Sequence, residues 1–306
     1  MLAAFRRAGV TDLLGPAFAV VGVLGFAFKA ILIKLAYAWT AIDAVTLLTL
    51  RMIYSAPFFA LMAWWAARAR DVRPLARGDW FAIAWLGFIG YYVSSLVDFM
   101  GLQYVTAALE RLMLYLYPTI VVVLSALFFK QRITGRIIVA LALSYAGILL
   151  VFARDLKFAG DPDALWLGGA LVFASSFLYA CYLVGAGPVI ARLGSMRFIA
   201  LAMLTSALFI FAHFLLTRPL AMLLAPPRIQ LLSLTMAVFS TVLPTYLIAE
   251  AIKRMGASRT SLLGSLGPVF TIWLGAWILD EPVRWIQLAG AALVLAGVGL
   301  VTLRPR

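Results

Sequence analysis

The chain has 306 residues, of which 65% are hydrophobic and 12% are charged, and its mean hydropathy is +1.05. A soluble domain of this length would need far more polar surface to cover its core, so the composition excludes a soluble globular protein. The net charge of +13 does not indicate a nucleic-acid partner, because the Arg and Lys residues stand in short loops between apolar segments, as in membrane proteins.

Apolar stretches of about 20 residues recur along the chain, and each is long enough to cross the ~30 Å hydrocarbon core of a bilayer. We therefore expect an all-α integral membrane protein with ten transmembrane helices. The longest polar interruptions are Arg68–Asp79, Arg154–Asp163 and Thr217–Gln230. In chain order, the expected helices are 12–37, 44–67, 80–103, 107–128, 135–153, 164–185, 195–217, 229–252, 257–279 and 285–303.

The distribution of Lys and Arg predicts the orientation in the membrane. With the N-terminus inside, the cytoplasmic segments hold 16 Lys and Arg residues, and the external segments hold 5. Positive residues gather on the cytoplasmic side of membrane proteins. We therefore expect a multi-pass protein of a bacterial cytoplasmic (inner) membrane with both termini in the cytoplasm.

The chain also contains an internal repeat at an offset of 150 residues, which predicts two five-helix halves, 1–153 and 154–306. Ala and Leu coincide easily by chance, so the proline, the glycine and the acid match of Asp98 with Glu250 carry the weight. An odd number of helices per half inverts the second half in the membrane, which is the architecture of many secondary transporters. The informative matches are Pro118 with Pro268, and Ala146-Gly147 with Ala296-Gly297.

Charged side chains inside a membrane are costly and mark candidate functional sites. A tight helical hairpin around Val105 is expected to bring Asp98 and Arg111 to a similar depth, about 10 Å below the outer helix ends. Two interpretations remain open, a salt-bridge network that locks the hairpin and a site that binds a zwitterionic or anionic substrate. The residues expected to form this one layer and network are Lys29, Arg51, Asp98, Glu110 and Arg111.

Aromatic side chains accompany this layer at helical spacing. Tyr91 shares a helix face with Asp98, Tyr115 with Arg111, and Tyr179 with Tyr182. A tyrosine offers an apolar ring and one hydrogen bond, so we expect these four tyrosines to line a substrate cavity, with interhelical packing as the alternative. Prolines free backbone carbonyls within helices, and the expected helix kinks are at Pro118, Pro244 and Pro268.

Across essentially its whole length the chain resembles the drug/metabolite transporter (DMT) superfamily, EamA type. The resemblance implies ten helices in two EamA repeats and transport of small metabolites, since the family includes exporters of amino acids and aromatic compounds. The first half departs from the family at Lys130-Gln131, where an acid is usual. The residues that carry the resemblance are Pro118, Pro268, Asp280-Glu281, Ala146-Gly147, Ala296-Gly297 and Leu50-Arg51-Met52.

The sequence contains no phosphate-binding loop for ATP, and its single histidine, His213, and single cysteine, Cys181, exclude the usual zinc sites. We therefore expect no enzyme, no cofactor and no metal. The prediction is a secondary active or facilitative transporter that exports small amphipathic metabolites, amino acids or related compounds, by alternating access. The open alternatives are an exporter of larger amphipathic drugs or lipids, and a non-transporting membrane scaffold or sensor. A small-molecule substrate and the lipid bilayer are the expected partners, with protons as an open possibility for coupling.

Overall fold

The computed structural model describes residues 10–68, 74–129, 134–255, 260, 263–264 and 266–302. Every regular element in these ranges is helical. The first half contains α2 (Val10–Trp39), α3 (Ala44–Ala67), α4 (Arg77–Gly87), α5 (Ser94–Gly101), α6 (Ala107–Leu114), α7 (Tyr117–Phe129) and α8 (Gly135–Lys157). The second half contains α9 (Pro162–Leu193), α10 (Ser195–Thr217), α11 (Pro227–Ala237), α12 (Leu243–Met255), α14 (Gly267–Ile278) and α15 (Trp285–Thr302).

Ten apolar helical segments correspond to the ten predicted helices. In the described part of the chain, eight are long and apolar enough to cross a membrane, and the two shorter ones are Gly267–Ile278 and Trp285–Leu300. The predicted ten-helix fold in two halves is confirmed. The tight join predicted near Gly256 lies outside the described residues.

The sixth predicted helix is too short, because it ends at residue 185 whereas α9 continues to Leu193. Pro188 lies inside α9 and does not end it. The helix continues because Val189 and Leu193 are buried in a cluster that includes Ile83. The chain then turns at Gly194, whose φ of 80° lies in the left-handed region that glycine adopts without strain.

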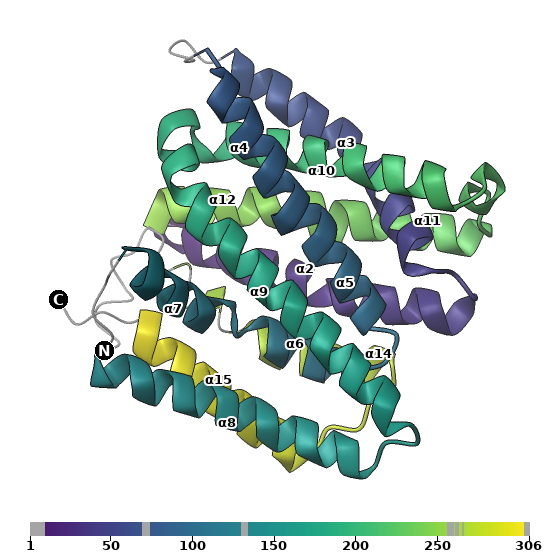
Figure 1. The fold of residues 1–306 in the computed structure, drawn as a ribbon, viewed down its shortest axis with the longest axis vertical. Helices are drawn as coiled ribbons and strands as arrows, with labels where there is room; N and C mark the ends of the chain where they lie inside the picture. Colours follow the sequence, from purple (N-terminus) through teal and green to yellow (C-terminus); the bar gives the residue numbers. More distant parts are fainter. Residues whose placement is uncertain are drawn as a thin grey trace.

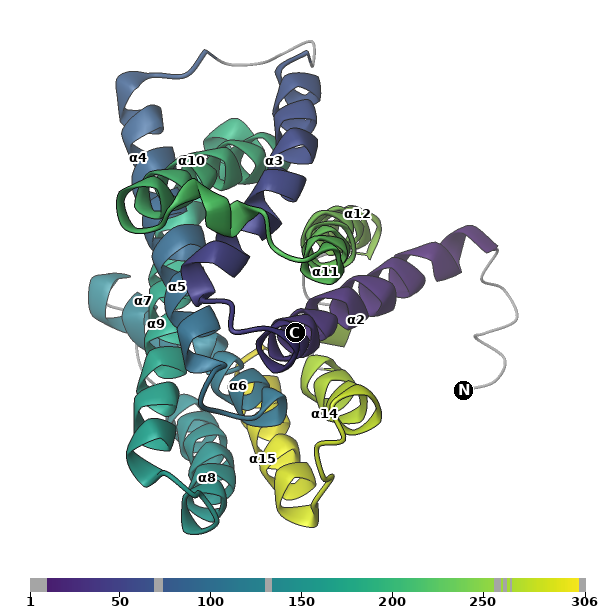
Figure 2. The ribbon, with the colours of Figure 1, turned by 90° about the vertical axis from the view of Figure 1, so that its right-hand side faces the viewer.

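Contacts between the halves follow a twofold exchange pattern. The first helix of each half packs on the third and fourth helices of the other, as α2 does on α12 and α14, and α9 on α5 and α7. The second helices, α3 and α10, pack on each other, and so do the last helices, α8 and α15. Figures 1 and 2 show α8 and α15 together at the bottom and α3 and α10 together at the top. Two inverted five-helix repeats account for this exchange.

The α8–α15 contact repeats at the level of single residues. A Cβ atom at Gly147 would lie 2.6 Å from the carbonyl oxygen of Gly290, and one at Gly297 would meet the backbone of Ala140. These two pairs exchange under the 150-residue offset, since Ala140 corresponds to Gly290 and Gly147 to Gly297. Small residues allow membrane helices to approach closely, so the glycine pattern seen in the sequence forms this interface.

The third helix of each half is wound as a π-helix at its centre. These segments, η1 (Phe88–Val93) and η3 (Val238–Val242), begin 150 residues apart. Pro244 is the second residue of α12, directly after η3, whereas Pro118 and Pro268 are the second residues of α7 and α14. Proline is well accommodated at the first turn of a helix, so the three prolines stand where helical segments restart.

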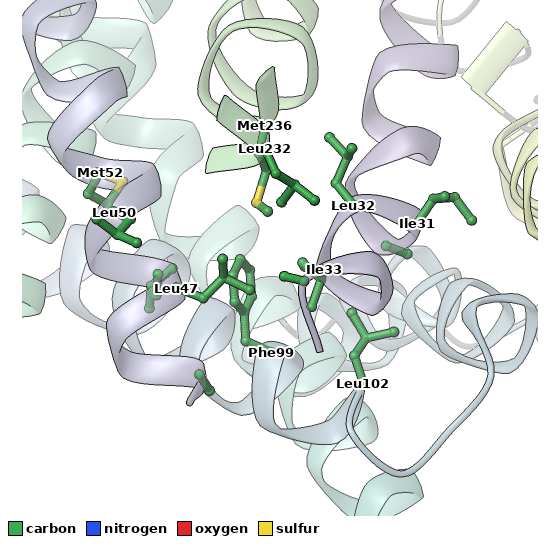
Figure 3. Packing of buried hydrophobic residues seen from close by; sticks show 14 of the residues in the cluster. Ile31, Leu32, Ile33, Leu47, Leu50, Met52, Phe99, Leu102, Leu232 and Met236 are labelled. Carbon is green, nitrogen blue, oxygen red and sulfur yellow. The ribbon is translucent and has the colours of Figure 1, made fainter. Parts of the chain in front are cut away.

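Apolar side chains fill the interior and also cover much of the outside. Figure 3 shows a core cluster that includes Ile31 of α2, Leu47 of α3, Phe99 of α5 and Met236 of α11. All nine tryptophans of the chain are exposed, from 38% for Trp39 to 86% for Trp285. A soluble protein would bury most of them, whereas tryptophans on the outside of a membrane protein meet lipid and the bilayer interface.

Candidate substrate site

Three charged side chains from three helices meet inside the first half. The ammonium nitrogen of Lys29 on α2 lies 2.7 Å from Oδ2 of Asp98 on α5 and 3.9 Å from Oε1 of Glu110 on α6. The side chains of Asp98 and Glu110 are 2% and 0% exposed, whereas that of Lys29 is 19% exposed. Two buried acids thus share one ammonium, and we call these three residues the charged cluster.

The predicted hairpin around Val105 builds the cluster. α5 ends at Gly101 and α6 begins at Ala107, so Asp98 and Glu110 lie a short distance on either side of the turn. The hydroxyl of Thr106 caps α6 by accepting a hydrogen bond from the backbone N–H of Leu109 at 3.2 Å. Lys34 donates a hydrogen bond of 2.9 Å to the carbonyl of Val105, which holds α2 against the turn.

The acids of the cluster have few hydrogen bonds. Three carboxylate oxygens accept no hydrogen bond from the described residues, namely both oxygens of Glu110 and Oδ1 of Asp98. Burying an ionised carboxylate without donors costs several kcal/mol or more. The cluster is therefore costly to the fold, as expected of residues that serve a function in the membrane.

Arg111 does not pair with Asp98, in contrast to the prediction. Its Nε donates a hydrogen bond of 3.1 Å to the hydroxyl of Thr271 on α14, and its terminal nitrogen donates to the carbonyl of Phe26 on α2. Equal depth in the membrane was the basis of the prediction, but depth leaves open the direction in which a side chain leaves its helix. Arg111 faces the second half, and Lys29 takes its place beside Asp98.

Arg51 is also buried, at 5% exposure, and its guanidinium lies over the ring of Phe99 at 5.0 Å from the ring centre. Its Nε has no hydrogen-bond partner among the described residues. The structure therefore divides the predicted network of five residues into the charged cluster, Arg111 with its contacts to α14 and α2, and Arg51 stacked on Phe99.

The predicted tyrosines lie next to one another in a continuous series of aromatic contacts. The hydroxyl oxygens of Tyr91 and Tyr182 are 2.9 Å apart, and the rings of Tyr182 and Tyr179 stack with centres 5.5 Å apart. Tyr117 packs edge-on against Tyr179 at 5.3 Å and lies 6.3 Å from Tyr115. We call these five residues the tyrosine chain. It runs between the two halves and joins the C-terminal end of α6 to the middle of α9.

Tyr117 and Thr271 belong to this region but were missed in the sequence. The helix is broken at Tyr115–Leu116, and beyond the break Tyr117 packs on Tyr179 of α9, whereas the hydroxyl of Tyr115 approaches Gly267 of α14. The available signal for Tyr117 was its position before Pro118, because the residue preceding a proline is disfavoured in a helix interior. Thr271 had no comparable signal, since its role depends on the approach of Arg111 from the other half.

The charged cluster occurs in one half only. At the exact 150-residue offset, Lys29 corresponds to Tyr179 and Glu110 to Thr260, and Asp98 corresponds to Ile248, two residues before its predicted match Glu250. The scaffold is thus symmetric, whereas the candidate site is not.

Loops of both halves line an open pocket of about 440 Å³ beyond the hairpin. Arg154 and Asp155 from the end of α8 line it, together with Arg284 and Glu281 from the loop before α15. Glu281 is the loop acid that carried part of the family resemblance. The corresponding positions of the first half, Lys130 and Gln131, lie outside the described residues.

Asp43 anchors the helix that carries Arg51. Its carboxylate caps α3 by accepting hydrogen bonds from the backbone N–H groups of Val45 and Thr46, and it forms an ion pair of 3.2 Å with Arg218. Burial raises the pKa of this carboxyl, but the hydrogen bonds from Thr46 and the charge of Arg218 outweigh burial, so the net shift of the pKa is downward.

The sequence profile of the EamA-like transporter family matches residues 13–153 and 166–303 of this chain. Among curated proteins, the chain is 29% identical over 284 residues to an uncharacterized transporter of Bacillus subtilis, covering 90% of this chain and 88% of that protein. It is 22% identical to an uncharacterized transporter of Synechocystis, covering 95% and 93% of the two chains.

A solved crystal structure superposes on this fold with a TM-score of 0.64 at 17% sequence identity, covering 94% of this chain and 95% of the other. At this identity the similarity concerns the fold alone. The family match and the curated relatives extend over both halves, so they include the hairpin with Asp98 and Glu110 as well as the opposing α14.

Proposed function

This chain belongs to the EamA-like transporter family and is a multi-pass membrane transporter rather than an enzyme, and we propose that it carries small amphipathic metabolites, amino acids or related compounds, across the membrane by alternating access. The observation that carries the proposal is the charged cluster of Lys29, Asp98 and Glu110, buried next to the tyrosine chain. Transport is either secondary active or facilitative, since no nucleotide site is present in the sequence.

The chemistry of the site suits a substrate with charged and apolar parts. The acids of the cluster can accept an ammonium group, while Arg111 and Arg51 can meet a carboxylate. The tyrosine chain adds aromatic rings with hydroxyl groups, which tolerate both apolar and polar parts of a ligand. Arg111 links the two regions because it stands beside Glu110 and lies one helical turn before Tyr115.

The twofold exchange of helix contacts supports alternating access. Exchanging the conformations of two inverted halves turns an inward-facing state into an outward-facing state around the same site.

The 16-to-5 charge distribution supports cytoplasmic termini, and the family resemblance supports export from the cytoplasm of a bacterial cell. Labelling of cysteines introduced near each terminus, in a Cys181→Ala background, tests the orientation. Labelling from the outside at either end contradicts it.

Counterflow in proteoliposomes tests the transport proposal. Vesicles are loaded with an excess of one unlabelled compound and diluted into a trace of the same compound in labelled form. Each of the amino acids and several small amines are screened in this way. Faster uptake into loaded than into empty vesicles is expected for a carrier. Arg111→Ala should abolish counterflow, whereas Glu250→Gln, which alters a surface ion pair with Arg254, serves as a control. If none of these compounds gives counterflow, the proposed substrate class is wrong.

A further inference from the structure

The two acids of the charged cluster are matched by only one nearby cation. Asp98 makes the close ion pair with Lys29 at 2.7 Å, while Glu110 is 3.9 Å from the same nitrogen. Arg111 directs its hydrogen bonds to Thr271 and to the carbonyl of Phe26, which are neutral groups. Arg51 stacks on Phe99. Among the described residues, Lys29 is thus the only cation that forms an ion pair with Glu110, and it lies closer to Asp98.

An ionised Glu110 would therefore be a fully buried carboxylate without a hydrogen-bond donor. A protonated Glu110 would avoid that cost and would carry an O–H group that can donate a hydrogen bond. The charged groups that act on Glu110 are Asp98 from α5, Lys29 from α2 and Arg111 from α6 itself. The described part of α14, which packs on α6, contains no titratable side chain.

We propose that Glu110 holds a proton in this state and is the site at which the carrier exchanges one proton for the ammonium group of an amine-bearing substrate. This inference rests on the proposed transport function and adds to it the coupling ion and the substrate group. In the exchange, the O–H bond of Glu110 breaks, its proton leaves to water, and the ionised carboxylate beside Asp98 receives the positive charge of the substrate. The charge of the site is the same before and after.

Lys29 is the most exposed member of the charged cluster. Its side chain retains 19% exposure, whereas the acids behind it retain 2% and 0%. In the exchange Lys29 stays paired with Asp98, and the substrate ammonium pairs with the carboxylate of Glu110 in place of the released proton. The Glu110 carboxylate thus holds either a proton or the substrate ammonium, so proton binding and substrate binding exclude each other.

Infrared spectroscopy of the purified protein in lipid tests the proton directly. At neutral pH the wild type should show the C=O stretch of a buried protonated carboxylic acid. Glu110→Gln should lack this band, and Glu250→Gln, an acid-to-amide change at the surface pair with Arg254, should keep it. A band of equal intensity in wild type and Glu110→Gln overturns the proposal. This readout requires no substrate, so it remains decisive if counterflow fails.

Gradient-driven uptake tests the coupling. With a compound that gives counterflow, a difference of about one pH unit should support about tenfold accumulation by the wild type, for one proton exchanged per substrate charge. In Glu110→Gln the ratio of accumulation with and without the gradient should fall to about one, whatever the absolute rate. Counterflow without any effect of the gradient in the wild type overturns coupling and leaves transport intact, so the two proposals fail separately.

Discussion

The backbone N–H of Ala107, the first residue of α6, donates a hydrogen bond of 3.0 Å to Oε1 of Glu281, which lies in the loop between α14 and α15. A carboxylate is stabilising at a helix N-terminus because it satisfies a free N–H group and interacts favourably with the helix dipole. The loop acid of the second half therefore holds the helix of the first half that presents Glu110 and Arg111. The position of the candidate site depends on contact between the halves at this point.

Glu281→Ala should destabilise the protein, because it leaves the start of α6 without this acceptor. Loss of a helix cap costs about 0.5–2 kcal/mol. The change is measured as the melting temperature of the purified protein in detergent. Asp280→Asn is the matched control, because Asp280 has a φ of 54° and asparagine adopts this conformation as readily. Equal melting temperatures of Glu281→Ala and the wild type would show that the cap is dispensable.

Lys29 and Asp98 should be energetically coupled more strongly than Arg111 and Asp98. Removing one partner of a buried ion pair costs about 3–5 kcal/mol, because the other charge is left unpaired. A double-mutant cycle with Lys29→Met and Asp98→Asn, read from thermal unfolding, measures the coupling. The cycle with Arg111→Met is the comparison. If Asp98 couples more strongly to Arg111, the pairing in the charged cluster is not the one that stabilises the protein.

The tyrosine chain should tolerate the loss of a hydroxyl better than the loss of a ring. Tyr182→Phe removes only the hydrogen bond to Tyr91, which contributes about 1 kcal/mol. Tyr179→Ala removes its ring contacts with Tyr117 and Tyr182 and should raise the half-saturating substrate concentration in counterflow by a larger factor. Tyr145→Ala, at an exposed position of α8, is the control. Equal effects of the three changes would argue against a role of this chain in binding.

Gly147→Ala should lower the melting temperature, whereas Gly187→Ala should not. At Gly147 the added methyl group would lie 2.6 Å from the carbonyl oxygen of Gly290, so α8 and α15 must separate. At Gly187 no atom lies within 4 Å of the added group. Alanine is favoured over glycine in a helix by about 1 kcal/mol, so Gly187→Ala should be neutral or stabilising. The same substitution thus has opposite expected effects, and similar melting curves would contradict the close α8–α15 contact.

Asp43 should make stability depend on pH in the acid range. Because its pKa is lowered in the folded protein, its contribution is complete above the unfolded value of about 4 and is lost as the pH falls through the lower folded value. Asp43→Asn keeps a capping oxygen but loses the charge that pairs with Arg218. The melting temperatures of wild type and Asp43→Asn should therefore differ at neutral pH and converge in the acid range. A constant difference across this range would contradict the lowered pKa.

The number of helices, the two halves and the aromatic and charged candidate residues could be predicted from the sequence. A bilayer demands long apolar helices, so length and composition determine how many segments cross it. Proline and glycine recurred at the 150-residue offset, because each half uses them at the same helix start and the same close contact. These features depend on residue type and position along the chain alone.

Tertiary structure decided which of the charged residues meet. Spacing along a helix gives the depth of a side chain but not the neighbour it faces, so Asp98 and Arg111 were expected to pair although Lys29 is the partner of Asp98. After the break at Tyr115–Leu116, Tyr117 packs on Tyr179 and joins the tyrosine chain. Because α14 packs on α6, Arg111 donates its hydrogen bond to Thr271. Such choices depend on the rotation of helices against one another, which is determined by side chains distant in sequence and cannot be read from one helix at a time.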